Sequence, residues 1–193
     1  MISDVVGVVL SGGKSTRMGR DKAAIEFGGE PMLERAVAAL SLVFDAVLVA
    51  GDSTVAAEVE TVTDVIAHGG PLSGLDAVYR RAEGKAVFLL AVDLPFVDAG
   101  VIREIAGPGV ESTGTRVPVT RGRLQPLCAL YGADLGPHVR DHLESDDRSM
   151  FGFIASIEDV DLVEMDPDVF ENVNTAEELS AALKRFGQHR STH

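Results

Sequence analysis

Residues 5–22 read Val-Val-Gly-Val-Val-Leu-Ser-Gly-Gly-Lys-Ser-Thr-Arg-Met-Gly-Arg-Asp-Lys. Positions 5–10 form an unbroken apolar run rich in β-branched residues, which is typical of a strand buried on both faces of a parallel sheet. Positions 11–22 are mostly Gly, Ser, Thr and charged residues, without helical or strand periodicity. This composition predicts a loop at the carboxyl end of the strand, where ligands of parallel α/β sheets bind.

The rest of the first half alternates between strand-like and helix-like segments. Apolar runs predict strands at 46–50, 61–66 and 86–92, and helices are predicted from Pro31 to about Phe44 and over 72–82. Strands that alternate with helices indicate βαβ units with right-handed crossovers. We therefore predict an α/β protein, a single-domain Rossmann-like three-layer αβα sandwich around a mostly parallel sheet.

The second half is less regular. Strands are predicted at 115–120 and 125–131, on either side of an Arg-Gly-Arg turn, and a helix at 134–143. The sequence Thr-Ala-Glu-Glu at 175–178 is a capping box, so a last helix is predicted over 176–186.

Composition excludes several classes of partner. The 193 residues carry 30 acidic and 17 basic side chains, a formal net charge of −13. A surface of this sign repels nucleic-acid phosphate and anionic membranes, so we expect neither as a partner. No apolar run approaches the roughly 18 residues of a membrane span, and Met1–Asp4 lacks the basic start of a secretory signal. The single cysteine, Cys128, cannot form an internal disulfide, and we expect a cytoplasmic protein.

Positive charge is nevertheless concentrated in the loop after the first strand. This loop contains four basic residues, Lys14, Arg17, Arg20 and Lys22, and one acidic residue, Asp21. Such a cluster is either a solvated face or a site for a small polyanion, and two adjacent glycines favour the second interpretation. Gly12 and Gly13 lack a Cβ atom, so the backbone can turn its N–H groups towards a phosphate. Arg17 and Lys22 can then place charge on the outer phosphates of a nucleotide.

This loop is neither of two common phosphate-binding motifs. A Walker A motif ending in Gly13-Lys14-Ser15 needs a glycine at position 8, where the chain has valine. The dinucleotide fingerprint Gly-x-Gly-x-x-Gly is not matched by the spacing of Gly12, Gly13 and Gly19. A different glycine-rich pattern is therefore needed to explain the loop.

Residues 10–22 match the pattern Leu-x-Gly-Gly-x-Ser-x-Arg-Met-Gly-x-Asp-Lys of nucleotidylyltransferases that activate small metabolites. Four further segments are similar to motifs of that family and follow in its order: Gly70–Gly74, Val92–Phe96, Gln125–Leu127 with Tyr131, and Asn172–Thr175. The sequence most closely resembles the molybdenum cofactor guanylyltransferases. The resemblance implies one nucleotidyltransferase domain over residues 1–186, and we expect a frayed tail over 187–193.

The resemblance also implies a reaction, in which GMP passes from GTP to the phosphate of molybdopterin or its molybdenum-loaded form and pyrophosphate is released. Arg17, Lys22 and Asp93 are then expected to be catalytic, with Asp93 holding a Mg²⁺ ion that bridges the phosphates. The expected nucleotide-binding residues are Leu10, Ser11, Gly12, Gly13, Lys22, Gly70, Pro71 and Leu72. Gln125 and Asn174 are expected to contact substrate, and molybdoenzyme assembly proteins are expected as partners.

Three alternatives stay open. They are a CTP-dependent cytidylyltransferase of the same cofactor, another metabolite-phosphate nucleotidylyltransferase, and a nucleotide-binding regulator without turnover. The Gly12–Gly13 pair is similar to the GTP-using branch, whereas CTP-using relatives tend to carry Ala-Gly there. Residues 65–68 lack the aspartate that relatives commonly have before Gly70, so the identity of the base stays open. Pyrophosphate release with GTP and with CTP would separate these alternatives.

Overall fold

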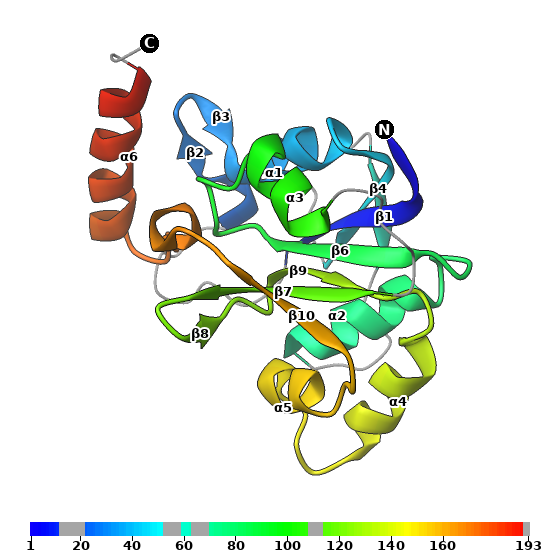
Figure 1. Cartoon of the computed structure of the whole chain (residues 1–193). Helices are drawn as coiled ribbons and strands as arrows, with labels where there is room; N and C mark the ends of the chain where they lie inside the picture. The colour runs from blue at the N-terminus through cyan, green and yellow to red at the C-terminus, as the bar shows by residue number, and fades with distance from the viewer. Residues whose placement is uncertain (12–21, 52–58, 63–69, 108–113, 191–193) are drawn as a thin grey trace.

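The predicted first strand is confirmed, and most of the loop predicted after it lies outside the described residues. The computed structural model describes the whole chain except residues 12–21, 52–58, 63–69, 108–113 and 191–193 (Figure 1). Strand β1 (Ile2–Leu10) has its central residues, Val5 to Val9, buried. It pairs in parallel with β4 (Phe44–Ala50) on one side and with β6 (Ala86–Ala91) on the other, so Leu10 lies opposite both Ala50 and Ala91. The carboxyl ends of three strands therefore meet at one edge.

The sheet is mixed but largely parallel. Its order is β10-β7-β9-β6-β1-β4-β5, and β8 pairs with β7. The strands not yet described are β5 (Glu60–Val62), β7 (Thr115–Thr120), β8 (Arg123–Leu124), β9 (Cys128–Tyr131) and β10 (Val160–Glu164). Strand β9 runs antiparallel to both β6 and β7, whereas β10 is parallel to β7 and β5 is parallel to β4.

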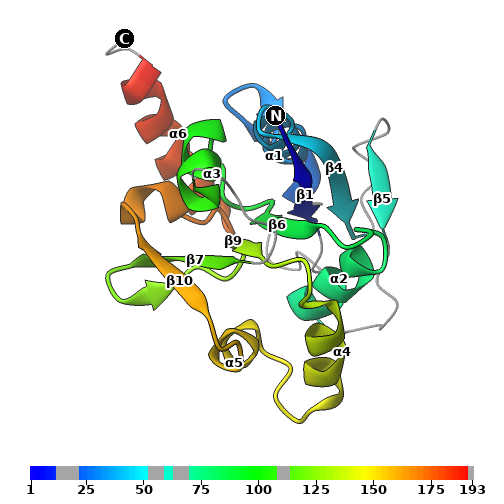
Figure 2. The same cartoon turned by 45° about the vertical axis from the view of Figure 1, so that its right-hand side comes forward.

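Helices cover both faces of the sheet, which confirms the predicted three-layer α/β fold (Figure 2). One face carries α1 (Met32–Ser41), α3 (Ala99–Ala106) and α6 (Ala176–Arg190). The other carries α2 (Gly70–Tyr79), α4 (Gly136–Glu144) and α5 (Met150–Ala155). None of the helices within the described ranges is long and apolar enough to cross a membrane.

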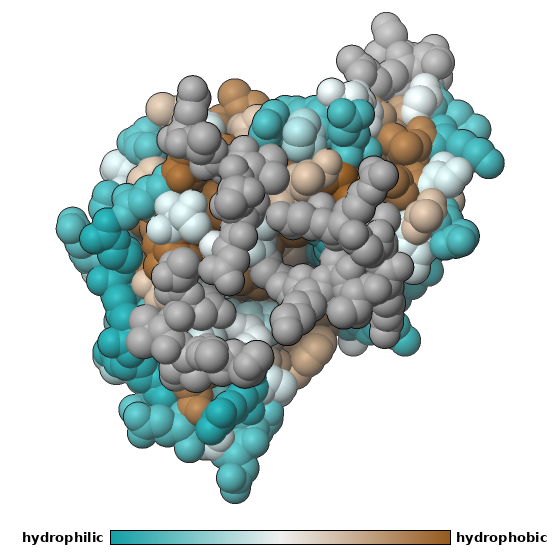
Figure 3. Space-filling view, turned by 180° about the vertical axis from the view of Figure 1, so that it is seen from behind, coloured by the Kyte–Doolittle hydropathy of each residue, from teal (hydrophilic) through white to brown (hydrophobic). Residues whose placement is uncertain are grey.

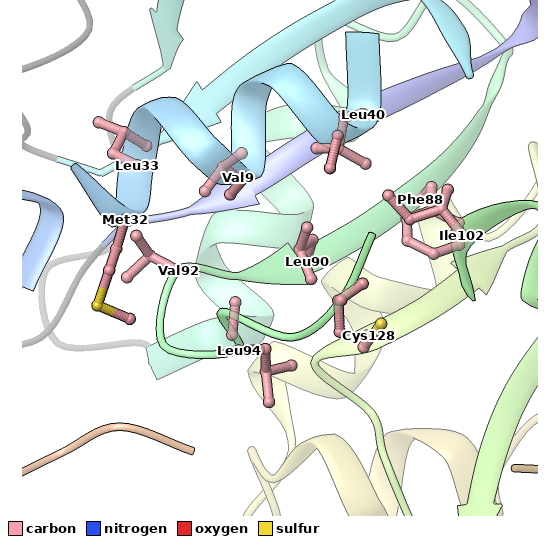
Figure 4. Close-up of a cluster of buried hydrophobic side chains, with 14 of the residues drawn as sticks. Val9, Met32, Leu33, Leu40, Phe88, Leu90, Val92, Leu94, Ile102 and Cys128 are labelled. Atoms are coloured by element: carbon pink, nitrogen blue, oxygen red, sulfur yellow. The ribbon is translucent and has the colours of Figure 1, made fainter. Parts of the chain in front are cut away.

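The core between the sheet and the first helical layer explains why these segments fold as they do. Leu33 and Leu40 of α1, spaced to share one helix face, are fully buried against Val9 and Leu90 of the sheet (Figure 4). Seen from behind, the described surface is hydrophilic along most of its rim (Figure 3). Burial of continuous apolar runs on both faces of the central strands is therefore the main force that selects this topology.

Several boundaries differ from the prediction. Helix α2 spans Gly70–Tyr79 instead of 72–82, and Phe44 begins β4 instead of ending α1. The last helix does not end at Phe186 but continues to Arg190, so the predicted helix end is wrong, while fraying of the tail from residue 187 stays a prediction. A single glycine weakens a helix by only about 1 kcal/mol, and the Phe186 ring lies 5.0 Å from the Phe27 ring, which holds this end of the helix against the fold.

Several short elements were not predicted. They include the hairpin of β2 (Glu26–Phe27) and β3 (Glu30–Pro31), helix α5, strand β10, and the 3₁₀ helix η2 (Pro167–Phe170). Each is short, and β10 is a half-exposed edge strand whose sequence, Val-Asp-Leu-Val-Glu, has no continuous apolar run. A short element stabilised by its tertiary neighbours leaves little periodicity in the sequence.

Candidate active site

The predicted lysine and aspartate lie together at the carboxyl edge of the sheet. Asp93 comes two residues after the end of β6, and the Val92 amide donates to the Leu10 carbonyl at 3.2 Å. The Lys22 Nζ lies 3.0 Å from Asp93 Oδ2, with side chains 22% and 21% exposed. The two opposite charges therefore form a partly buried ion pair that remains open to a ligand.

Lys22 is held by the segment that follows it. It begins the 3₁₀ helix η1 (Lys22–Ala24), and its carbonyl accepts from the Ile25 amide at 3.2 Å. The next apolar side chains, Ala23, Ile25 and Phe27, are all buried in the core beneath α1. The backbone of Lys22 is thus anchored, while its long side chain reaches the site.

Asn174 joins this pair from the far end of the chain. Its Oδ1 accepts a hydrogen bond from Lys22 Nζ at 2.5 Å. The amide of the preceding residue, Val173, donates to the Asp93 carbonyl at 3.0 Å, and the Val173 side chain is fully buried. The segment before α6 is therefore fastened directly to the turn after β6, and Asn174, predicted as a substrate contact, lies in the same cluster.

The capping box predicted at residues 175–178 is confirmed and fixes the backbone beside Asn174. Glu178 Oε2 accepts from the amides of Asn174 at 2.6 Å and Thr175 at 3.0 Å. In return, the Glu178 amide donates to Thr175 Oγ1 at 3.1 Å. Carboxylate oxygens bound to N–H donors form short, charge-assisted hydrogen bonds, so this turn is well restrained.

The turn that carries Asp93 is packed on both sides. Leu94 and Val97 are buried, and Figure 4 shows Val92 and Leu94 in the core cluster. Arg35 of α1 donates from Nε to the Pro95 carbonyl at 2.7 Å. The Arg185 guanidinium of α6 lies 4.1 Å from the centre of the Phe96 ring. Two cationic side chains from different helices thus restrain the residues after Asp93.

Gln125 is not part of the Lys22 cluster in the contacts of the described residues. Its Nε2 donates to Thr120 Oγ1 at 3.1 Å, and its backbone amide donates to the Pro118 carbonyl at 2.8 Å. Its segment does reach the same sheet edge, because the Leu127 carbonyl accepts from the Ala91 amide at 2.7 Å. A substrate contact by Gln125 stays a prediction.

The remaining predicted nucleotide-binding residues divide into three groups. Arg17, Gly12 and Gly13 lie outside the described residues. Leu10 ends β1, and the amide of the buried Ser11 donates to the Ala50 carbonyl at 2.8 Å. Gly70 and Pro71 begin α2, where Gly70 has a φ of 65°, and the fully buried Leu72 side chain packs in the core. Only backbone groups of Leu72 can therefore face a ligand.

The donor set fits a magnesium ion only if a ligand supplies most of the coordination. Within the described ranges, no group of three or more His, Cys, Asp or Glu side chains could hold a metal by itself. Asp93 presents one carboxylate and Asn174 one amide oxygen in the same cluster. Mg²⁺ is commonly bound by one or two carboxylates together with substrate phosphates, so this arrangement suits a metal shared with a nucleotide.

Comparison with known proteins agrees with the architecture and the motifs. Residues 7–160 match the family described as MobA-like NTP transferase domain. The molybdenum cofactor guanylyltransferase of Syntrophotalea carbinolica is 31% identical, with 89% of this chain and 87% of that protein covered. The corresponding protein of Rhizobium leguminosarum bv. trifolii is 30% identical, with 93% and 92% covered. The crystal structure of molybdopterin-guanine dinucleotide biosynthesis protein A from Archaeoglobus fulgidus has the same fold, with a TM-score of 0.76 at 19% identity over 95% of this chain and 99% of that one.

Proposed function

The chain belongs to the MobA-like NTP transferase family, and we propose from this membership that it is a molybdenum cofactor guanylyltransferase. It transfers GMP from GTP to the terminal phosphate of molybdopterin or its molybdenum-loaded form. Two relatives at 30% and 31% identity bear the name molybdenum cofactor guanylyltransferase and align with about nine-tenths of this chain. The observation that carries the proposal is the contact of Lys22 with Asp93 and Asn174 at the carboxyl edge of the sheet.

The reaction is a substitution at phosphorus. An oxygen of the pterin phosphate forms a bond to the α-phosphorus of GTP, while the bond from that phosphorus to the bridging oxygen of the β-phosphate breaks. Pyrophosphate leaves with the electron pair of the broken bond. Both reactants are anions, so catalysis needs charge neutralisation and alignment more than a strong base.

Lys22 is suited to neutralise the leaving pyrophosphate. Its ammonium carries three donors, and the contacts with Asp93 Oδ2 and Asn174 Oδ1 use two of them. Among the contacts of the described residues, the third donor is left for a phosphate oxygen, which it can bind without loss of the other two contacts. Arg17 is assigned a parallel role on the phosphates by its place in the loop pattern, and its guanidinium can bind two phosphate oxygens at once.

Asp93 would hold the magnesium ion, with Asn174 beside it as a neutral oxygen donor. When bound, the ion supplies positive charge to the phosphates and aligns them for in-line attack. The N-terminus of α2 offers the backbone N–H groups of Gly70 and Leu72 to the nucleotide, as helix N-termini commonly do for phosphates, whereas Pro71 between them has no N–H. Together these residues bind and orient the triphosphate, and the pterin phosphate supplies the attacking oxygen.

The experiment that tests the proposal measures pyrophosphate release by the purified protein with Mg²⁺, using GTP or CTP, with and without molybdopterin. We expect release that requires GTP and the pterin together. Release with CTP in place of GTP would assign the protein to cytidylyl transfer. Binding of GTP without release under any condition would assign it to a nucleotide-binding regulator.

A further inference from the structure

We propose that Glu178 is a positioning residue for the guanylyl transfer, because its carboxylate holds the turn that presents the Asn174 amide oxygen to the Lys22 ammonium. Glu178 is exposed and lies in the first turn of α6. It reaches the reacting groups through one intermediate, Asn174, and touches neither Lys22 nor Asp93 in the described contacts. The expected effect of Glu178 on catalysis rests on the proposed function, whereas its hydrogen bonds to the turn before α6 are observed in the structure.

The geometry exceeds what a capping box requires. In such a box, the side chain three residues into the helix accepts from the amide of the capping residue, which here is Thr175. Glu178 Oε2 makes that bond at 3.0 Å, and it also accepts from the amide of Asn174 at 2.6 Å. The second bond lies outside the helix and restrains the residue whose side chain binds Lys22.

The Asn174 backbone is restrained on its other side by the Asp93 turn. The Val173 amide donates to the Asp93 carbonyl at 3.0 Å. Asn174 is therefore fixed between a bond to the aspartate turn and a bond to the helix. One short turn consequently sets the positions of both charged groups, since it touches the backbone of Asp93 and the side chain of Lys22.

Loss of the Glu178 bond would release the Asn174 side chain from this arrangement. The Lys22 side chain has four rotatable carbons, so without the Asn174 oxygen its ammonium can settle wholly on Asp93, away from a phosphate. Displacement of a catalytic group by about 1 Å can cost up to a hundredfold in rate. We therefore expect Glu178 to affect turnover more than GTP binding, because the turn contacts Lys22 and Asp93, the residues assigned to the reacting phosphates.

Three control variants separate positioning from simple helix capping. Glu177→Ala removes a neighbouring exposed charge from the same first turn of α6. Thr175→Ala removes the hydroxyl that accepts from the Glu178 amide, but leaves the Asn174 amide able to bond to Glu178. Glu178→Gln keeps an acceptor oxygen at the same reach while removing the charge. A capping role alone would make Thr175→Ala and Glu178→Ala similar.

The kinetic test compares kcat and the GTP KM of these variants with those of the wild-type protein. We expect Glu178→Ala to lower kcat about tenfold with the GTP KM within about threefold. Glu178→Gln should stay within about threefold of wild type, and Glu177→Ala and Thr175→Ala within about twofold. If Glu178→Ala does not fold, Glu178→Asp, which keeps the charge but shortens the reach, should show the same fall in kcat. Equal effects of Glu178→Ala and Thr175→Ala would overturn the proposal.

A second readout does not depend on activity. Amide hydrogen exchange of the ligand-free protein reports the two bonds to Glu178 directly. We expect exchange at the Asn174 amide to accelerate at least about tenfold in Glu178→Ala and to stay unchanged in Glu177→Ala. Unchanged exchange in Glu178→Ala would overturn the structural link. If the wild-type protein shows no guanylyl transfer but the two variants exchange as expected, the proposed function is refuted and the structural link remains.

Discussion

The Lys22 ammonium lies 3.0 Å from the Asp93 carboxylate, although 71 positions separate the two residues in the sequence. The parallel pairing of β1 with β6 causes this meeting, because it places the exits of both strands at the same edge. Asp93 follows β6 by two residues, and Lys22 is anchored by the buried residues after it, so the pair lies at the edge that the sheet topology sets. We expect a triphosphate to bind at this edge, as ligands of parallel α/β sheets commonly do.

Removal of the lysine charge should lower catalytic efficiency. Lys22→Ala deletes a charge-assisted contact that is worth about 1.5–3 kcal/mol, so we expect kcat/KM for GTP to fall about 10- to 100-fold. The measurement is steady-state pyrophosphate release. Lys184→Ala, which removes an exposed lysine on α6, serves as the control and should leave kcat/KM unchanged. An activity of Lys22→Ala within twofold of wild type would refute the role of Lys22.

The same substitution should strengthen metal binding in the absence of nucleotide. The Lys22–Asp93 pair is about one-fifth exposed, and a pair of this kind contributes up to about 1 kcal/mol after solvent screening. Without the competing ammonium, we expect Lys22→Ala to bind Mn²⁺ about fivefold more tightly. Electron paramagnetic resonance of free Mn²⁺ measures this affinity. Asp93→Asn should lose the site, and equal affinity in wild type and Lys22→Ala would contradict a metal at Asp93.

Two adjacent glycines provide a matched test of how the hairpin before α1 packs on α6. A Cβ atom at Gly28 would meet the Phe186 ring at 2.5 Å, whereas one at Gly29 would have no atom within 4 Å. Both residues have positive φ, which costs a non-glycine residue about 1–2 kcal/mol. We expect Gly29→Ala to lower the free energy of unfolding by only that amount. Gly28→Ala should lower it by about 1–3 kcal/mol more, because the new methyl group also overpacks against Phe186. Urea unfolding measures both losses, and equal values would show that Phe186 does not pack there.

Burial of Cys128 predicts a loss of stability at alkaline pH. The thiol is fully buried, and desolvation raises its pKa above the ordinary value. A group whose pKa is higher in the folded state stabilises the fold below its unfolded pKa of about 8.5 and loses that contribution as the pH rises. Between pH 8.5 and 10, the loss should reach about 2 kcal/mol. The free energy of unfolding of Cys128→Ala should fall less steeply over this range, and identical slopes would contradict the assignment.

The parts of the fold that were predictable carry strong local signals. Strands β1 and β6 are continuous apolar runs because both of their faces are buried. Helix α6 begins at a capping box that is recognisable in the sequence at residues 175–178. Strand β10 could not be predicted, because its five residues, Val-Asp-Leu-Val-Glu, form neither an alternating pattern nor a continuous apolar run. Its position depends on pairing with β7, a tertiary contact.

The candidate site shows the same division. The meeting of Lys22 and Asp93 could be predicted, because the loop after β1 and the turn after β6 lie at the same edge of a parallel sheet. The hydrogen bond from the Asn174 amide to Glu178 could not be predicted, because the capping-box pattern specifies only the bond from the Thr175 amide. The contact of Arg35 with the Pro95 carbonyl likewise depends on the packing of α1 against the Asp93 turn, and no spacing in the sequence encodes it.

The most direct test of the central claim is a crystal structure of the protein with a non-hydrolysable GTP analogue and Mg²⁺. We predict that the metal binds Asp93 and phosphate oxygens together, with the Lys22 ammonium within hydrogen-bonding distance of the β- or γ-phosphate. A nucleotide bound away from the ends of β1 and β6, or a triphosphate that contacts neither residue, would contradict the account.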